Sequence, residues 1–171
     1  MKTNIVLIGL PGCGKTTIGK QLSQKLAFPF IDIDEEIEIS QQKKISQLFE
    51  NGETYFRDIE TEVTKKVARA DFSVISTGGG VVLREENMTA LGENGLIIFL
   101  NRSVSDIKGD IDIEVRPLLQ DGVEKLKTLH KQRIHLYERY ADLTINNNQA
   151  LDVIIEQLIA ELPVELTKGR F

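Results

Sequence analysis

The sequence predicts an α/β fold in which helices cover both faces of a parallel β-sheet. Short apolar runs alternate along the chain with longer stretches whose apolar residues recur at helical spacing. The first run, residues 4–8 (NIVLI), is continuously apolar, which is typical of a strand buried on both faces. Because strands that alternate with helices usually pair in parallel, these observations favour a sheet enclosed by helices.

The first predicted helix follows a glycine-rich turn at residues 9–14. Ile18, Leu22 and Leu26 are spaced four apart and predict a helix over residues 15–26. The other expected elements are a strand over 28–33, a mostly helical stretch over 34–70 with a break at Asn51–Gly52, strands over 72–76 and 96–100, a helix over 122–140, a strand over 143–145 and a helix over 150–162. Residues 163–171 are expected to form a frayed tail.

Length and composition limit the class of protein. At about 150 residues per domain, the 171 residues predict one domain over 1–171. A net charge of −5 without a basic stripe argues against nucleic-acid binding. The apolar runs are far shorter than the roughly 20 residues of a membrane helix, and the N-terminus has no signal-peptide pattern. The single cysteine, Cys13, fits a reducing compartment, so we expect a cytoplasmic protein.

Two segments interrupt the alternation of strands and helices. Residues 34–70 are too long for one crossover helix, which predicts an insertion after the second strand, over about 34–60. Residues 109–121 contain Gly109, several acids and Pro117 without clear periodicity. Because long irregular segments in compact domains are often functional, we expect a mobile lid over about 109–121.

A phosphate-binding pattern occupies the turn after the first strand. Residues 9–16 (GLPGCGKT) match G-x-x-x-x-G-K-[ST] between a predicted strand and a predicted helix. Glycines allow successive N–H groups to form an anion nest, and the helix N-terminus adds a positive dipole. Lys15 supplies a charge for the β- and γ-phosphates, and the Thr16 hydroxyl can bind Mg²⁺. The expected nucleotide-binding residues are Gly12, Cys13, Gly14, Lys15, Thr16 and Thr17.

Cys13 itself has two interpretations. A helix N-terminus can lower a thiol pKa, which would suit a redox sensor. Its position in the loop favours the alternative that only its backbone N–H matters.

Two acids follow at the end of the second predicted strand. Asp32 and Asp34 are two residues apart, so on a strand they would point to the same face. Ligands of open α/β sheets bind outside the carboxyl ends of the strands, which would place both carboxylates beside the phosphate loop. The alternative is that Asp34 is the N-cap of a helix, with Glu35 and Glu36 in its first turn.

Further motifs occur in a fixed order along the chain. They are F-R-x-x-E at 56–60, the glycine triplet at 78–80, R-P-L at 116–118, and Arg133 followed by Tyr137. An Arg–Glu pair three apart on a helix is often only a surface ion pair. Together with the phosphate loop and the two acids, however, these motifs make the chain similar to the shikimate kinase family over residues 3–160.

This resemblance implies a fold, a reaction and a set of site residues. The fold is the three-layer P-loop kinase fold, with a five-stranded parallel sheet in the order 2-3-1-4-5, a substrate-binding insertion and a lid. The reaction is the ATP-dependent phosphorylation of the 3-hydroxyl of shikimate, a step toward chorismate and aromatic amino acids. The partners are ATP and shikimate, with one Mg²⁺ ion as cofactor, and family members are commonly monomers.

The resemblance also assigns roles by position. Shikimate would be held by Asp34, Arg57, Gly79, Gly80 and Arg133. Thr16 and Asp32 would serve Mg²⁺. Arg116 would reach the ATP phosphates from the lid, so the expected catalytic residues are Lys15, Asp34 and Arg116. A guanidinium suits a carboxylate, and an aspartate can accept from a hydroxyl, so the residue types fit this substrate.

One departure and three alternatives accompany this assignment. Many family members have a lid arginine against adenine where this chain has Lys108, Gly109 and Asp110, and a lysine lacks the planar stacking group. Another small-metabolite kinase of the same fold, such as a gluconate kinase, is the first alternative and would bind an uncharged or differently charged polyol. A neutral sugar would leave the paired arginines poorly partnered. A GTP-hydrolysing switch would need N-K-x-D after the fourth strand, where residues 100–103 read LNRS. A purely structural ATP-binding module is the third.

Overall fold

The central sheet has the predicted strand order. The computed structural model describes residues 1–109 and 119–167, with side chains from residue 122 onward after the gap. Within these ranges the strands are parallel neighbours in the order β2-β3-β1-β4-β5, as predicted. Their bounds are β1 (Asn4–Ile8), β2 (Phe30–Asp32), β3 (Val74–Ser76), β4 (Gly95–Asn101) and β5 (Leu143–Asn146).

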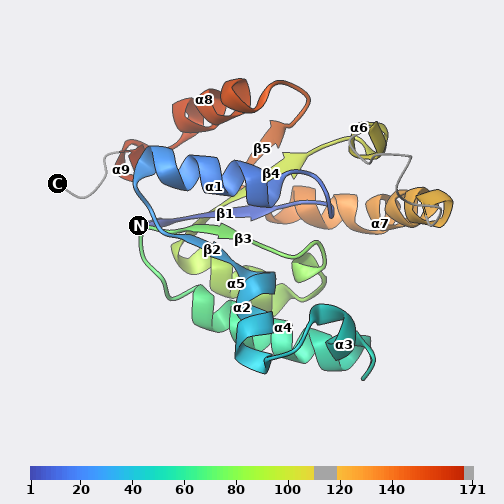
Figure 1. Cartoon of the computed structure of the whole chain (residues 1–171). Coiled ribbons are helices and arrows are strands. Elements are labelled where there is room, and N and C mark those ends of the chain that lie inside the picture. Colours follow the sequence, from blue (N-terminus) through green and yellow to red (C-terminus); the bar gives the residue numbers. More distant parts are fainter. Residues whose placement is uncertain (110–118, 168–171) are drawn as a thin grey trace.

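Helices cover both faces of this sheet (Figure 1). On one face α1 packs beside α8, while α4, α5 and α7 lie on the other. The helices are α1 (Lys15–Leu26), α2 (Ile33–Gln41), α3 (Ile45–Phe49), α4 (Glu53–Val67), α5 (Glu85–Asn94), α6 (Val104–Gly109), α7 (Leu119–Tyr140), α8 (Leu151–Glu161) and α9 (Val164–Thr167), with a 3₁₀ turn η1 (Val81–Leu83). None of the helices in these two ranges is long and apolar enough to cross a membrane.

The first strand and first helix form where the sequence predicts them. Every residue of β1 is buried, because β3 and β4 flank it and helices cover both faces. Helix α1 begins directly after Gly14 and buries Ile18, Leu22 and Leu26. It ends at Ala27, whose φ of 54° turns the chain into the left-handed region.

The second strand is shorter than predicted, and the helical stretch after it has an additional break. Strand β2 ends at Asp32 because the Asp32 carboxylate accepts hydrogen bonds from the N–H groups of Asp34 and Glu35 and caps α2. The N-cap is therefore Asp32, not Asp34. The predicted break near Gly52 is confirmed, but α2 also stops earlier, at Gln42, which has a φ of 51°.

Several further boundaries differ from the sequence prediction. Strand β3 starts at Val74 rather than at residue 72, and α5 fills a stretch for which no element was predicted. The expected frayed tail contains α9, because Leu166 is buried in the core. Helix α7 already begins at Leu119, so the predicted lid range overlaps it. Gly109, the first residue of that range, ends α6, and residues 110–118, with Arg116, lie outside the described residues.

Candidate active site

The phosphate loop joins β1 to α1 at the carboxyl edge of the sheet. Gly9, Gly12 and Gly14 all have positive φ angles, which L-residues with side chains rarely adopt. The Lys15 ammonium donates to the carbonyls of Gly9 at 2.7 Å and Leu10 at 2.9 Å, and Lys15 is only 8% exposed. The Lys15 ammonium therefore satisfies two carbonyl oxygens of the loop itself.

Cys13 lies on the inner side of this loop. Its N–H donates to the Leu10 carbonyl at 3.1 Å, and its buried sulfur is 3.6 Å from the Lys15 ammonium. The Cys13 N–H is thus engaged within the loop, whereas the other predicted nucleotide-binding residues line the open side. A cavity of about 730 Å³ is bordered there by Gly12, Gly14, Lys15, Thr16 and Thr17.

The two predicted metal-binding side chains lie together in this cavity. The Thr16 hydroxyl donates to Asp32 Oδ2 at 3.1 Å, while Asp32 Oδ1 caps α2. A hydroxyl and one carboxylate oxygen are hard ligands, and Mg²⁺ usually takes few protein ligands and completes its shell with phosphates and water. The donor set therefore fits Mg²⁺ beside a nucleotide.

Asp34 borders the same cavity, although it is not on the strand as predicted. It lies in the first turn of α2, which turns its side chain toward Gly78. Burial is the main reason that the pKa of Asp34 rises from 3.8 to about 6. The charges of Asp32 and Glu60 raise this pKa further, whereas Lys15 and Arg57 oppose the rise. A carboxylate with a pKa near 6 suits proton acceptance at neutral pH.

Arg57 and Glu60 form a buried ion pair on α4, not a surface bridge. Arg57 Nη1 donates to Glu60 Oε1 at 2.7 Å, and Glu60 is 1% exposed. Burial raises the pKa of Glu60, and the Arg57 charge acts in the opposite direction. The guanidinium lies against Gly80, where an added Cβ would overlap the Arg57 guanidinium nitrogens. Only glycine leaves room for this contact.

A second cavity, of about 600 Å³, adjoins the first. It contains both Arg57 and Arg133, and it shares Pro11 and Leu126 with the phosphate cavity. Arg133 is buried, and no carboxylate of the described chain lies within ion-pair distance of it. Two guanidinium groups thus border the second of two adjoining cavities, and only that of Arg57 makes an ion pair within the described ranges.

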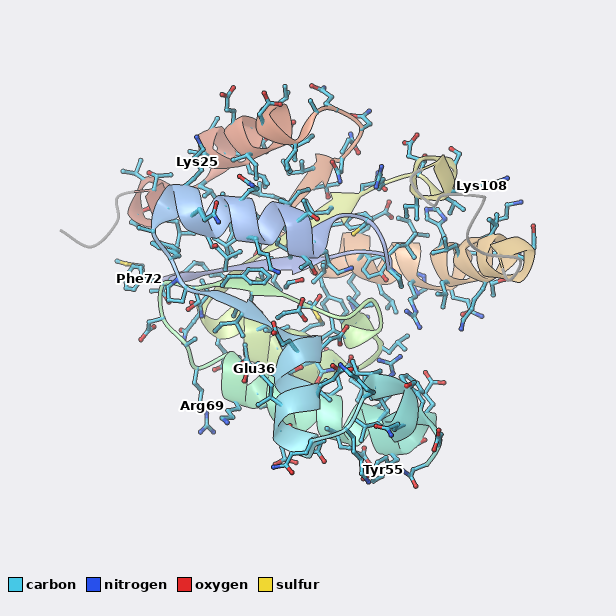
Figure 2. The ribbon with its side chains drawn as sticks, viewed as in Figure 1. Lys25, Glu36, Tyr55, Arg69, Phe72 and Lys108 are labelled. Atoms are coloured by element: carbon cyan, nitrogen blue, oxygen red, sulfur yellow. The ribbon has the colours of Figure 1, made fainter. Side chains whose placement is uncertain are left out.

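The aromatic residues near this site divide into two groups. Phe49 borders the second cavity and stacks on Phe56, with ring centroids 4.2 Å apart, while the Arg57 guanidinium lies near both rings. Tyr55 instead lies at the outer rim of the α3–α4 region and is exposed (Figure 2). The first two rings therefore help to form the arginine-lined wall, and Tyr55 does not.

A small third cavity, of about 380 Å³, shares Arg102 with the phosphate cavity. Asn147 borders it, and the Asn147 side-chain amide donates to the Cys13 carbonyl at 2.8 Å. Sequence reasoning missed Asn147, although its place directly after the last strand could have suggested it. Lys108 lies on α6 and is exposed, and it does not border this cavity in the described structure (Figure 2).

A larger cavity lies away from the phosphate loop. It has a volume of about 880 Å³ and is bordered by α4 and α5 residues such as Lys65 and Glu86. These charges pair with one another across its surface, and Arg84 pairs with Asp58. Because this cavity lacks the phosphate loop, we place the candidate active site in the two adjoining cavities at the carboxyl edge of the sheet.

The fold and this edge define a class of protein. A phosphate loop, an adjacent hydroxyl–carboxylate pair and an arginine-lined cavity beside them are the parts of a P-loop kinase for a small anionic acceptor.

Comparison with known proteins identifies the family within this class. The shikimate kinase family model matches residues 11–163. A shikimate kinase of Clostridium botulinum is 46% identical over 158 residues, covering 92% of this chain and 96% of the relative. The structure of a shikimate kinase from Acinetobacter baumannii in complex with shikimate is 34% identical, with a TM-score of 0.84 and coverage of 94% and 93%. That from Aquifex aeolicus is 33% identical, with a TM-score of 0.79 and coverage of 92% and 94%. The chain belongs to the shikimate kinase family.

Proposed function

We propose that this enzyme transfers the γ-phosphoryl group of ATP to the 3-hydroxyl of shikimate, giving ADP and shikimate 3-phosphate. The observation that supports the proposal is that two cavities adjoin and share Pro11 and Leu126, one with the phosphate loop and one with Arg57 and Arg133. A small carboxylate with hydroxyl groups fits between them, with its charged end on the arginines and a hydroxyl toward the loop.

ATP binding requires the phosphate loop to change its hydrogen bonds. The β- and γ-phosphates would draw the Lys15 ammonium away from the carbonyls that it now contacts. The cavity beside Asn147 and Arg102 opens next to the loop and has room for the nucleoside end. Arg116 lies outside the described residues, and we assign its phosphate contact on the sequence motif alone.

Thr16 and Asp32 would hold one Mg²⁺ ion, which supplies charge neutralisation for the phosphates. The Asp32 carboxylate also caps α2, the helix that carries Asp34. One side chain would therefore contact both the metal ion and the helix that positions the acceptor's base. We therefore assign Asp32 a positioning role in addition to its metal-side role.

Asp34 would orient the attacking hydroxyl and accept its proton. The 3-oxygen forms the new bond to the γ-phosphorus, the bond to the β–γ bridging oxygen breaks, and the hydroxyl proton passes to the Asp34 carboxylate. The pKa of about 6 keeps Asp34 mainly ionised at neutral pH and still basic enough to take this proton. Phosphoryl transfer otherwise depends on positioning and charge.

The acceptor's carboxylate would bind Arg133 and Arg57, and the backbone at Gly79 and Gly80 would approach the ring closely. Glu60 holds Arg57 in place, so the guanidinium is pre-organised before the acceptor arrives. Because Arg133 has no carboxylate partner in the described chain, an anionic acceptor would supply one.

A coupled ADP-release assay tests the acceptor directly. Purified enzyme with MgATP is mixed with shikimate, with gluconate, or with no acceptor. We expect rapid ADP release with shikimate only. Gluconate also carries a carboxylate, so equal or faster release with gluconate would contradict shikimate as the preferred acceptor but not the arginine–carboxylate contact. In a parallel reaction with MgGTP, slow hydrolysis without any acceptor would favour a nucleotide switch.

Oligomeric state and location rest on the sequence. We propose a monomer in the cytoplasm, and sedimentation velocity over a concentration series would test the first of these. A mass twice that of the chain would contradict it.

A further inference from the structure

The buried hydroxyl of Tyr137 reaches from α7 to the glycine triplet. Tyr137 is 0% exposed, and its hydroxyl donates to the Gly79 carbonyl at 2.6 Å. This bond joins segments that are 58 residues apart in the sequence. It connects the helix that carries Arg133 with the backbone to which we assign the acceptor.

Packing fixes the direction of this hydroxyl. The Tyr137 ring stacks on Phe99 of β4, with centroids 5.2 Å apart and planes 21° from parallel. An aromatic ring held on a strand has little freedom, so its hydroxyl stays aimed at one acceptor. Burial also raises the pKa of the hydroxyl to about 12, against the opposing charge of Arg133, and Tyr137 therefore remains a neutral donor at physiological pH.

The hydrogen bond orients one particular peptide plane. The Gly79 carbonyl and the Gly80 N–H belong to the same peptide unit, and the described chain has no cis peptide bonds. In a trans unit the two groups point in opposite directions, so fixing the carbonyl on Tyr137 also aims the Gly80 N–H away from α7. Within the described chain this buried N–H has no hydrogen-bond acceptor, although buried amides are nearly always paired.

The same peptide is confined on its other sides. A Cβ added at Gly79 would lie 2.7 Å from Pro11 Cδ of the phosphate loop, and one at Gly80 would collide with the Arg57 guanidinium. The peptide therefore sits between the phosphate loop, Arg57 and Tyr137. A small rotation of this plane would change what the Gly80 N–H can reach.

We propose that Tyr137 is a positioning residue that orients the Gly79–Gly80 peptide for the acceptor substrate. Tyr137 is fully buried and does not itself touch the substrate. The proposal rests on the acceptor site described above. It assigns to the hydroxyl a role in acceptor affinity and none in nucleotide binding.

The test is Tyr137→Phe, which keeps the ring and removes only the hydroxyl. We expect the KM for shikimate to rise about 5- to 30-fold, with the KM for ATP and kcat within about twofold, because uniform binding of one substrate is lost. Tyr140→Phe is the matched control. Tyr140 lies on the same helix near Arg139, and its hydroxyl makes no hydrogen bond within the described chain. This variant should leave both KM values unchanged.

Two outcomes would overturn the proposal. One is an unchanged shikimate KM in Tyr137→Phe, and the other is an equal rise in both KM values, which marks a merely structural role. The kinetics are measured at 15 °C, and thermal unfolding of each variant checks that it is folded at that temperature. The shikimate KM of Arg133→Ala tests the assignment of the acceptor site independently of Tyr137. A shikimate effect in Tyr137→Phe alone would support the peptide's orientation and refute the role given to Arg133.

Discussion

Replacing Asp34 by Asn is expected to abolish turnover and, at neutral pH, to stabilise the fold. The pKa of Asp34 rises from 3.8 to about 6 because the carboxylate is buried beside Asp32 and Glu60. The native state therefore binds a proton more tightly than the unfolded chain. The ionised group opposes folding fully above about pH 6, and this penalty disappears as the pH falls through 3.8.

The size of the effect follows from the size of the shift. About two pKa units correspond to roughly 3 kcal/mol at neutral pH, and partial exposure of the side chain reduces this to about 2–3 kcal/mol. For a chain of this length, such a gain raises Tm by about 4–10 °C. Loss of the proton acceptor should lower kcat by roughly 10²- to 10⁴-fold.

Calorimetry of wild type and Asp34→Asn between pH 4 and pH 8 measures this directly. Glu35→Gln is the matched control, since Glu35 is an exposed acid in the same first turn of α2. It should be neutral or slightly destabilising, because it removes a favourable charge from a helix N-terminus. An Asp34→Asn variant that is less stable than wild type at pH 8, or whose gain does not shrink toward pH 4, would refute the reasoning.

Wild-type kinetics give a second view of the same group. Because the ionised form of Asp34 accepts the proton, and the pKa of about 6 is that of the free enzyme, kcat/KM for shikimate should fall tenfold per pH unit below about pH 6. A flat profile between pH 5 and pH 7 would remove Asp34 as the base.

Four further predictions concern the charged groups and one glycine. Lys15→Ala should abolish turnover with little change in secondary structure by circular dichroism, and near-normal turnover would contradict its phosphate role. Arg57→Ala should destabilise the enzyme by about 3–5 kcal/mol in urea unfolding, because Glu60 would stay buried without its partner. Arg133 makes no ion pair with a carboxylate in the described part of the chain. Arg133→Ala should therefore weaken shikimate binding about 10- to 100-fold in titration calorimetry, with ATP affinity unchanged. Gly80→Ala places a methyl group on the Arg57 guanidinium and should raise the shikimate KM at least tenfold; an unchanged KM would show that the arginine can move aside.

Local patterns determined much of the phosphate side of this protein. The bounds of β1 and α1 follow from the sequence because a continuous apolar run, a glycine turn and a four-residue spacing are all properties of short segments. The strand order came from the family resemblance that the motifs carry rather than from a local pattern, and the sheet confirms it. In contrast, α5 was not predicted, because its buried apolar residues, Met88 and Leu91, are too few to give a clear helical spacing.

The acceptor side depended on tertiary structure. Asp32 and Asp34 were predicted to share a strand face, yet a capping bond begins α2 between them and still brings both to one cavity. Arg57 and Glu60 look like a surface pair in the sequence and are buried in the fold.

The long-range contacts of Tyr137 with Gly79 and of Asn147 with Cys13 join residues 58 and 134 positions apart. No local pattern can encode these contacts or the raised pKa of Asp34. Both arise from burial and from proximity between distant segments, which exist only once the chain has packed.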